Sequence, residues 1–219
     1  MNRPEPSADP RYGRYVGLLA VVILVAITIN LLATKPTGIT GIEPGHSIPP
    51  FAVPLALGTL NGDANVATHA DEGAAGRVPA CSVRGPQVLN VCELYERGPV
   101  VLALFVNGGS CPAILSDMQS LLTTFPGVGF AAVAIKGSRT QLRHLVRSRR
   151  LTFPVGIDSD GALAALYRVA TCPQVTFALP GGVVQSKALL IRPPLETLRA
   201  RVSALVASAR ARGWKGHAG

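Results

Sequence analysis

The sequence predicts an α/β domain built on a central mixed sheet flanked by helices, with one long apolar helix ahead of it. Two continuous apolar runs, Val100–Val106 and Val128–Ile135, are typical of strands that are buried on both faces of a sheet. Segments with helical spacing of apolar residues alternate with such runs. The pair Gly181-Gly182 indicates a hairpin between the last two strands.

The apolar segment 15–33, "YVGLLAVVILVAITINLLA", has no charged side chain. At about 1.5 Å per residue it can cross a hydrocarbon core of about 30 Å. A cleaved signal peptide is the alternative, but it would have a shorter apolar region and a small-x-small cleavage site, which "LLATKPTG" does not offer. Arginines at 3, 11 and 14 precede the segment, and only Lys35 follows closely. The positive-inside rule then keeps the N-terminus in the cytoplasm and exports the rest.

This interpretation divides the chain into five parts. They are a cytoplasmic tail (1–14), a single transmembrane anchor (15–34), a linker (35–44), one globular domain (45–213) and a short C-terminal tail (214–219). The part after the anchor is rich in Gly and Pro and lacks periodicity, as linkers are. The next part, 51–68, alternates weakly and contains the turn signal Asn61-Gly62-Asp63. We therefore expect a hairpin as an N-terminal extension of the domain.

Strand and helix patterns alternate through the rest of the domain. The pattern predicts strands at 100–106, 128–135, 153–159, 174–180 and 183–191, and helices at 112–124, near 142–146, at 161–169 and from Pro193 and Pro194 to about Gly213. Ser138 is the expected cap of the second helix, whose inner face is Leu142, Leu145 and Val146. The inner face of the last helix is expected to be Leu195, Leu198, Val202, Leu205 and Val206. This order predicts parallel strands first and an antiparallel hairpin last, with helices on both faces.

The formal net charge is +9, and the excess is spread over the part after the predicted anchor, most densely in the stretches 143–150 and 199–215. We interpret them as solvated helix faces beside an anionic membrane. A nucleic-acid partner is not expected, because aromatic residues make up only 5% of the chain and no groove-reading motif is present. The histidines are scattered singly, at His46, His69, His144 and His217, and no zinc spacing occurs, so we predict neither a metal site nor a cofactor.

Four cysteines, Cys81, Cys92, Cys111 and Cys172, all follow the predicted anchor. In an oxidising compartment an even number favours disulfides, and four cysteines allow three connectivities. The chain has no Cys-x-x-Cys motif. Ile114 stands three residues after Cys111, where a dithiol enzyme would carry its second cysteine.

Three stretches of the domain resemble the redoxin branch of the thioredoxin-like superfamily. They are "PGHSIPPFAVPLALG", "GPVVLALFVNGGSCPAILSDM" and "FPVGIDSDGALAALYRVATCPQVTFALPGG", within a likeness that runs from about Gly45 to Ala209. This group includes alkyl hydroperoxide reductase/thiol-specific antioxidant proteins and extracytoplasmic thiol–disulfide oxidoreductases. The resemblance implies a thioredoxin-like fold in which Pro173 is the cis-proline.

Cys111 lies where the loop Gly108-Gly109-Ser110 meets a predicted helix, with Pro112 next to it. A thiol at a helix N-terminus faces unpaired N–H groups and the positive end of the dipole, which favour the reactive thiolate. The two glycines would let a substrate approach the backbone closely. The alternative is that Cys111 is an inert, small helix residue.

The resemblance also supplies a partner for Cys111. In that fold, the residue before the cis-proline lies against the N-terminus of the active-site helix, and here that residue is Cys172. We therefore expect Cys111 to attack and Cys172 to resolve, with Cys172 the less exposed. The remaining pair, Cys81 and Cys92, is interpreted as a structural disulfide that adds about 3 kcal/mol by closing a short loop, and a second redox pair is the alternative.

Three functions remain open. The first is a thiol–disulfide oxidoreductase that exchanges with protein thiols or disulfides, or with a membrane electron donor. The second is a peroxiredoxin-like antioxidant, but a hydroxyl residue and an arginine typical of those enzymes are replaced by Gly108 and the segment 174–177, "QVTF". The third is a non-catalytic or copper-handling module. His144, the one histidine of the core domain, falls in a predicted surface helix and weakens the copper version.

The predicted topology can be tested with protease added to intact spheroplasts. Because the positive-inside rule exports everything after the anchor, the domain from Gly45 onward should be degraded while a cytoplasmic marker survives. Protection of the domain until the spheroplasts are lysed would contradict this topology.

Overall fold

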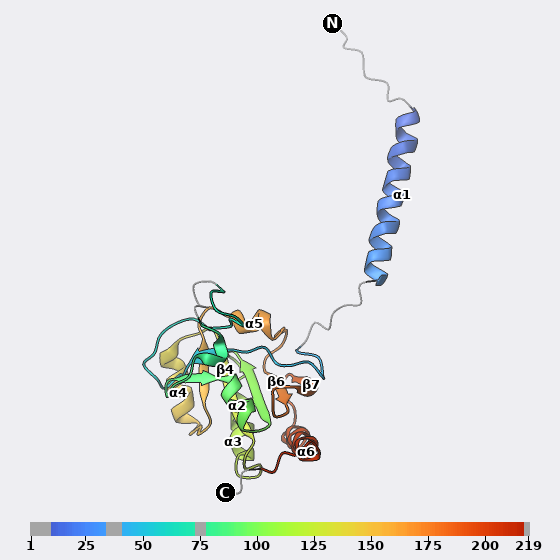
Figure 1. Ribbon diagram of the computed structural model, residues 1–219. Coiled ribbons are helices and arrows are strands. Elements are labelled where there is room, and N and C mark those ends of the chain that lie inside the picture. Colours follow the sequence, from blue (N-terminus) through green and yellow to red (C-terminus); the bar gives the residue numbers. More distant parts are fainter. Residues whose placement is uncertain (1–9, 34–40, 73–77, 217–219) are drawn as a thin grey trace. The chain divides into compact units, whose positions relative to one another are not determined.

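The structure is a computed structural model that describes residues 10–33, 41–72 and 78–216 (Figure 1). The chain divides into two compact units, Met1–Ile39 and Thr40–Gly219. Residues 1–9, most of the predicted linker and His217 lie outside the described residues.

The first unit contains one helix, α1, which spans Pro10–Ala33. Its side chains from Tyr15 to Thr28 are all exposed. In the part of the chain that the structure describes, no helix combines the length and apolar character required to span a membrane. The membrane anchor therefore stays a prediction.

The second unit is built on a five-stranded sheet with the order β5-β4-β3-β6-β7. The strands are β3 (Val100–Phe105), β4 (Gly129–Ile135), β5 (Val155–Asp158), β6 (Gln174–Ala178) and β7 (Val184–Leu190). β3, β4 and β5 run parallel, whereas β6 is antiparallel to both β3 and β7. The mixed sheet with a C-terminal hairpin is thus confirmed.

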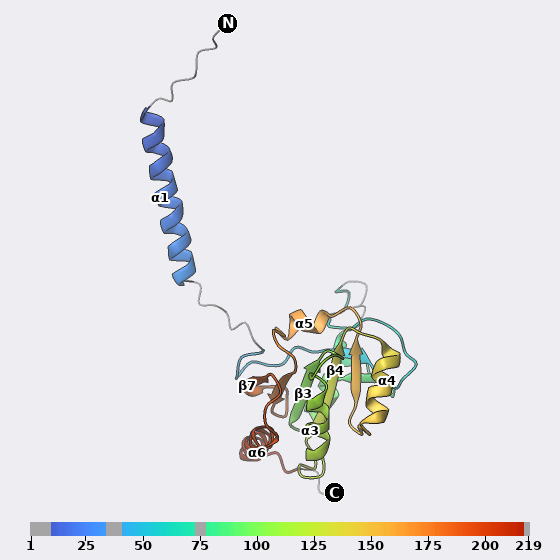
Figure 2. The ribbon, with the colours of Figure 1, turned by 180° about the vertical axis from the view of Figure 1, so that it is seen from behind.

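Apolar layers cover both faces of this sheet. The β3 side chains Val101, Ala103 and Phe105 join one core with α3 (Ala113–Leu121), α4 (Arg139–Ser148) and α6 (Leu195–Ala211). The intervening β3 side chains join a second core with α2 (Val91–Arg97) and α5 (Ala162–Leu166). Figure 1 shows the face carrying α2, and Figure 2 shows α3 and α4 from behind. The continuous apolar character of β3 follows, because both of its faces are buried.

The predicted N-terminal hairpin is present only as a single antiparallel bridge. The strand β1 (Ala52–Pro54) pairs antiparallel with β2 (Val88–Asn90) in a separate two-stranded sheet. Across the expected turn only Ala52 and Asn65 form a bridge, with two backbone hydrogen bonds of 2.9 Å.

After β1, hydrogen bonds from distant side chains hold residues 55–60 in place of a second hairpin strand. The Gln87 carboxamide oxygen accepts from the N–H groups of Thr59 and Leu60, at 2.7 and 2.9 Å. Arg139 and Arg143 of α4 donate to carbonyls of residues 55–60. Because these long-range contacts satisfy the backbone, the loop does not need a second strand.

The helices match the predicted faces closely. Ser138 occupies the N-cap position of α4, but its hydroxyl makes no capping hydrogen bond. Leu142 and Val146 are buried, while Leu145 is half-buried. In α6 the residues Leu198, Val202 and Leu205 are buried, and Leu195 and Val206 are half-buried. The short helix α2, which has no counterpart among the helices predicted from the sequence, follows β2 directly.

Both ends of the second unit extend past the predicted domain limits of 45 and 213. The Gly41 N–H donates to the Arg168 carbonyl at 3.0 Å. Trp214 packs against the core that contains α6. Trp214 is also the single tryptophan of the chain, so its fluorescence can report on the unfolding of this unit.

The contact between the two sheets predicts a sharp cost at Gly156 of β5. A Cβ at this position would lie 2.5 Å from Val53 Cγ2 and 3.1 Å from Leu89 Cδ2, and both side chains are buried. Because β-branched Val53 has little freedom to move, Gly156→Ala should lower the free energy of unfolding by about 1–3 kcal/mol. Urea unfolding followed by Trp214 fluorescence measures this.

The matched control is Gly129→Ala in β4. A Cβ there has no neighbour nearer than 3.6 Å, so its effect should be clearly smaller. Equal losses in the two variants would show that the packing of β1 and β2 on β5 is not the cause.

Candidate redox site

The loop at the carboxyl end of β3 carries the first cysteine of the site. Gly108, Gly109 and Ser110 are exposed, whereas Cys111 and Pro112 are buried. Gly109 has φ +55°, a left-handed conformation that favours glycine. The Cys111 N–H donates to the Gly108 carbonyl at 3.3 Å, and α3 begins two residues later at Ala113. Cys111 thus lies in the turn just before the helix rather than in its first turn.

The second cysteine lies in the loop that leads into β6. The Cys172–Pro173 peptide bond is cis, as the resemblance implies. In the antiparallel pairing of β3 with β6, Leu104 lies opposite Gln174. This register brings the residues just before β6 alongside the residues just after β3.

The two loops meet in a disulfide between Cys111 and Cys172, with a Cα–Cα distance of 5.5 Å. The Val106 N–H donates to Cys172 Sγ at 3.1 Å. The predicted juxtaposition of these two cysteines is therefore confirmed, while the order in which they react stays a hypothesis. Ile114, at the position of a second dithiol cysteine, is fully buried in the core.

The exposures of the two cysteines are opposite to the expectation. Cys111 is only 6% exposed and belongs to the core that α3 contributes to. Cys172 is half-buried and packs against the edge of the same core. The prediction that Cys172 is the less exposed residue is wrong, because the turn before α3 directs Cys111 into the core while the loop before β6 stays at the surface.

Two arginines hold α3 in place behind the disulfide. Arg149 donates to the Pro112 carbonyl at 2.6 Å and to Ser116 Oγ at 3.2 Å. Arg192 forms a two-pronged ion pair with the buried carboxylate of Asp117, at 2.7 and 3.0 Å. Charge-assisted bonds of this kind fix orientation as well as adding energy. These two contacts were not predicted from the sequence, because Arg149 falls in a basic stretch interpreted as a solvated face. The acidic Asp117, on an otherwise apolar helix face, was the one sequence feature that could have indicated an ion pair.

A buried carboxyl group lies at the same edge of the sheet, at the end of β5. Asp158 accepts from the N–H groups of Gly161, Ala162 and Leu163 at 2.9–3.1 Å and so caps α5. Burial, aided by a hydrogen bond to Asp160, raises the pKa of Asp158 to about 6. Capping of α5 explains why a carboxyl group is buried here. None of the hydrogen bonds of Asp158 among the described residues involves Cys111 or Cys172.

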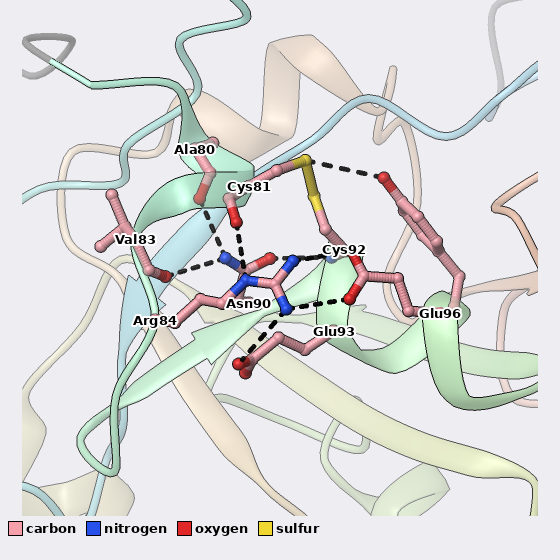
Figure 3. Close-up of polar contacts among 9 residues, drawn as sticks. Ala80, Cys81, Val83, Arg84, Asn90, Cys92, Glu93 and Glu96 are labelled. Carbon is pink, nitrogen blue, oxygen red and sulfur yellow. Dashed lines mark hydrogen bonds and ion pairs between the residues drawn. A yellow bond between two sulfur atoms is a disulfide. The ribbon is translucent and has the colours of Figure 1, made fainter.

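The other two cysteines form a second disulfide, with Cα atoms 5.4 Å apart (Figure 3). The prediction that Cys81 and Cys92 lie within disulfide reach is confirmed. Cys81 belongs to the short helix η1 (Ala80–Ser82), and Cys92 is fully buried in α2. Both contact the core on the opposite face of the sheet from Cys111.

A polar network surrounds this second disulfide. The Asn90 amide donates to the carbonyls of Ala80 and Val83, and its oxygen accepts from the Cys92 N–H (Figure 3). Arg84 binds the Glu96 carboxylate at 2.7 and 2.9 Å. The bond is therefore embedded in contacts that fix the loop 80–92 onto α2, which supports the structural interpretation.

Within the described ranges, no group of three or more His, Cys, Asp or Glu side chains is arranged to hold a metal ion. His144 is exposed on α4. It lines a cavity of about 560 Å³ together with Asn107, which belongs to the loop between β3 and Cys111, called the active loop below.

No protein-family profile matches this chain. A thiol-disulfide oxidoreductase, ResA, from Oceanobacillus iheyensis is 30% identical over 77 residues. The match covers 34% of this chain and 40% of that relative, so the chain spans well under half of the length of the curated relative it matches.

Solved structures share the fold. A putative thiol:disulfide interchange protein DsbE from Chlorobium tepidum superposes with a TM-score of 0.57 at 17% identity, covering 75% of this chain and 99% of that one. The peroxidoxin BcpB from Mycobacterium tuberculosis gives 0.53 at 14% identity, covering 78% and 97%. Together with the sheet order and the cis-proline loop, these likenesses show that the second unit has a thioredoxin-like fold.

The structural interpretation of the second disulfide predicts separate effects on stability and on chemistry. Replacing both Cys81 and Cys92 by alanine should lower the free energy of unfolding by about 3 kcal/mol, because the unfolded loop is no longer closed. Urea unfolding measures the loss. Thiol exchange at Cys111 and Cys172 should be retained in the folded variant, and its disappearance there would instead make Cys81–Cys92 a redox pair.

Proposed function

We propose that the chain is a thiol–disulfide oxidoreductase whose Cys111–Cys172 pair alternates between disulfide and dithiol. One observation carries the proposal. Two cysteines separated by 61 positions are joined at the carboxyl end of the central strand, beside a cis-proline and an exposed glycine-containing loop. A structural disulfide has no need of this position, whereas an exchange site needs a surface loop that a partner can reach.

The chemistry required is simple exchange through a mixed disulfide. A partner thiolate breaks the bond between the two cysteines, or a reduced cysteine attacks a partner disulfide. Both directions need two sulfurs within bonding reach, which the 5.5 Å Cα–Cα distance allows. No cofactor is required, because the electron pair moves between sulfur atoms.

We further propose that the protein works outside the cytoplasm, tethered by residues 15–33 to the cytoplasmic membrane. Its partners would then be exported proteins with thiols or disulfides, or a membrane electron donor. The similarity to ResA, named a thiol-disulfide oxidoreductase, supports the activity, and the apolar, uncharged run in α1 supports the tether. The proposed activity and the proposed location outside the cytoplasm are both consistent with four cysteines in two disulfides, since such bonds persist in oxidising compartments.

Peroxide reduction is the less supported activity. A peroxidatic cysteine needs donors that stabilise charge on the departing oxygen. Gly108 offers no side-chain hydroxyl, and residues 174–177 provide no guanidinium and are buried in β6. The likeness to BcpB concerns the fold and adds no such donor.

A redox titration of the full chain tests the proposal. Equilibration in glutathione buffers should show one two-electron transition in the reactivity of Cys111 and Cys172 towards alkylation, while Cys81 and Cys92 stay protected. Cys111→Ser and Cys172→Ser should each abolish the transition. If alkylation of Cys111 and Cys172 does not change across the series, or if the two-electron transition survives either substitution, the pair is not an exchange site.

A further inference from the structure

The two sulfurs of the Cys111–Cys172 disulfide differ in their access to solvent. Cys111 is 6% exposed and lies within the core formed with α3. Cys172 is half-buried and borders a surface cavity of about 260 Å³. Cys111 is not among the residues that line this cavity. A partner thiol therefore has an open route to Cys172 and a closed one to Cys111.

The cavity lies between the active loop, the end of β4 and the segment from α5 to Cys172. Its lining is mostly apolar: Val106, Ile135, Ala164, Val169, Ala170, Thr171 and Cys172. Val106, at its margin, is 45% exposed. The hydroxyl of Thr171 is buried and has no hydrogen-bond partner in the part of the chain that the structure describes. The cavity thus offers an apolar approach to the Cys172 sulfur.

Thiol exchange also depends on the sulfur that leaves. When a thiolate attacks Cys172, the electron pair of the broken bond goes to Cys111. One residue, Pro112, separates Cys111 from the nine-residue helix α3. Cys111 therefore lies near the positive end of the helix dipole, which favours the thiolate form of Cys111. A better-stabilised thiolate leaves faster. Attack at Cys172 therefore combines the open route with a leaving sulfur that lies near the positive end of the α3 dipole.

The sulfur of Cys172 has its own stabilising contact. The Val106 N–H donates to it at 3.1 Å, from the backbone just after β3. A bond from an N–H group is stronger when the acceptor is ionised. This contact would therefore stabilise the Cys172 thiolate once a partner releases it.

We propose, resting on the proposed function, that the incoming thiolate attacks Cys172 of the oxidised protein and that Cys111 is the leaving sulfur. A bond forms between the partner sulfur and Cys172 Sγ as the Cys172–Cys111 bond breaks, and Cys111 carries away the electron pair. A second thiolate of the partner then attacks the partner sulfur and releases Cys172 as thiolate. The partner dithiol is oxidised to a disulfide, and the two cysteines are reduced and take up protons from water.

In the reverse direction, Cys172 is the attacking thiolate and Cys111 resolves the mixed disulfide. This is the opposite of the order that the sequence suggests, where Cys111 attacks. The difference arises from the exposures of the two residues, which the sequence does not give.

The location of the first mixed disulfide tests this order directly. The oxidised full chain is mixed with a limiting peptide that contains one cysteine, quenched with acid within the first turnover and digested without reduction. Mass spectrometry should find the peptide on Cys172. The peptide on Cys111, or equally on both, would overturn the order but leave the proposed function standing, whereas no adduct on either cysteine would contradict both.

A second measurement uses the single-cysteine variants. Cys111→Ser leaves only Cys172 in the site, and Cys172→Ser leaves only Cys111. With an aromatic disulfide such as dithionitrobenzoate at neutral pH, the Cys111→Ser variant should react about tenfold faster, because its thiol is the accessible one. The reverse ranking, or equal rates, would overturn the proposal.

The route itself can be blocked by a substitution outside the pair. Ala164 of α5 lines the cavity, whereas its neighbour Ala165 is exposed and does not. Ala164→Phe should slow the formation of the Cys172 adduct about tenfold, and Ala165→Phe, the matched control, should leave it unchanged. Circular dichroism and Trp214 fluorescence establish that both variants are folded. Equal rates in the two folded variants would show that the cavity is not the route.

Discussion

The antiparallel pairing of β6 with β3 determines where the two cysteines of the candidate redox site meet. The register that sets Leu104 opposite Gln174 places the cis-proline loop next to the loop that follows β3. Cys172 and Cys111, 61 positions apart in sequence, meet only because of that pairing. A shift of one residue would turn the side chains of β6 to the other face of the sheet and separate the two sulfurs.

The remaining layers keep this junction in place. Alternate side chains of β3 are buried on opposite faces of the sheet. Those on one face pack in a core with α3, α4 and α6, and those on the other pack in a core with α2 and α5. Arg149 and Arg192 attach the first turns of α3 to α4 and to the segment after β7. The disulfide between Cys81 and Cys92 lies on the opposite face and fixes the segment that packs there. The molecule thus has one disulfide within its scaffold and another at the end of its central strands.

The sequence was sufficient for the sheet and for the pairing of Cys111 with Cys172, and insufficient for the details around this pair. Continuous apolar runs predict β3 and β4 because strands buried on both faces must be apolar throughout. The expected partner of Cys111 followed from a resemblance at Cys172 and Pro173. The hairpin at 51–68 forms only one bridge, because other partners of this segment, Gln87, Arg139 and Arg143, are far away along the chain. No local pattern encodes such contacts.

The relative exposure of the two cysteines is the detail that matters most for mechanism. It depends on the turn before α3 and on the packing of Ile114 and Cys111 in the core, which are properties of the assembled layers. A helix N-terminus indicates which sulfur is stabilised as a thiolate, but it does not indicate which sulfur a partner can reach. The helix N-terminus lies next to Cys111 and the open route leads to Cys172, so the sulfur near the helix need not be the one that is attacked.

The candidate redox site depends on the connection between Cys111 and Cys172. Digestion of the natively oxidised full chain without reduction, followed by mass spectrometry of the linked peptides, tests that connection most directly. The structure predicts one peptide pair that joins Cys111 to Cys172 and another that joins Cys81 to Cys92. A linkage of Cys111 to Cys81 or Cys92 would contradict the account.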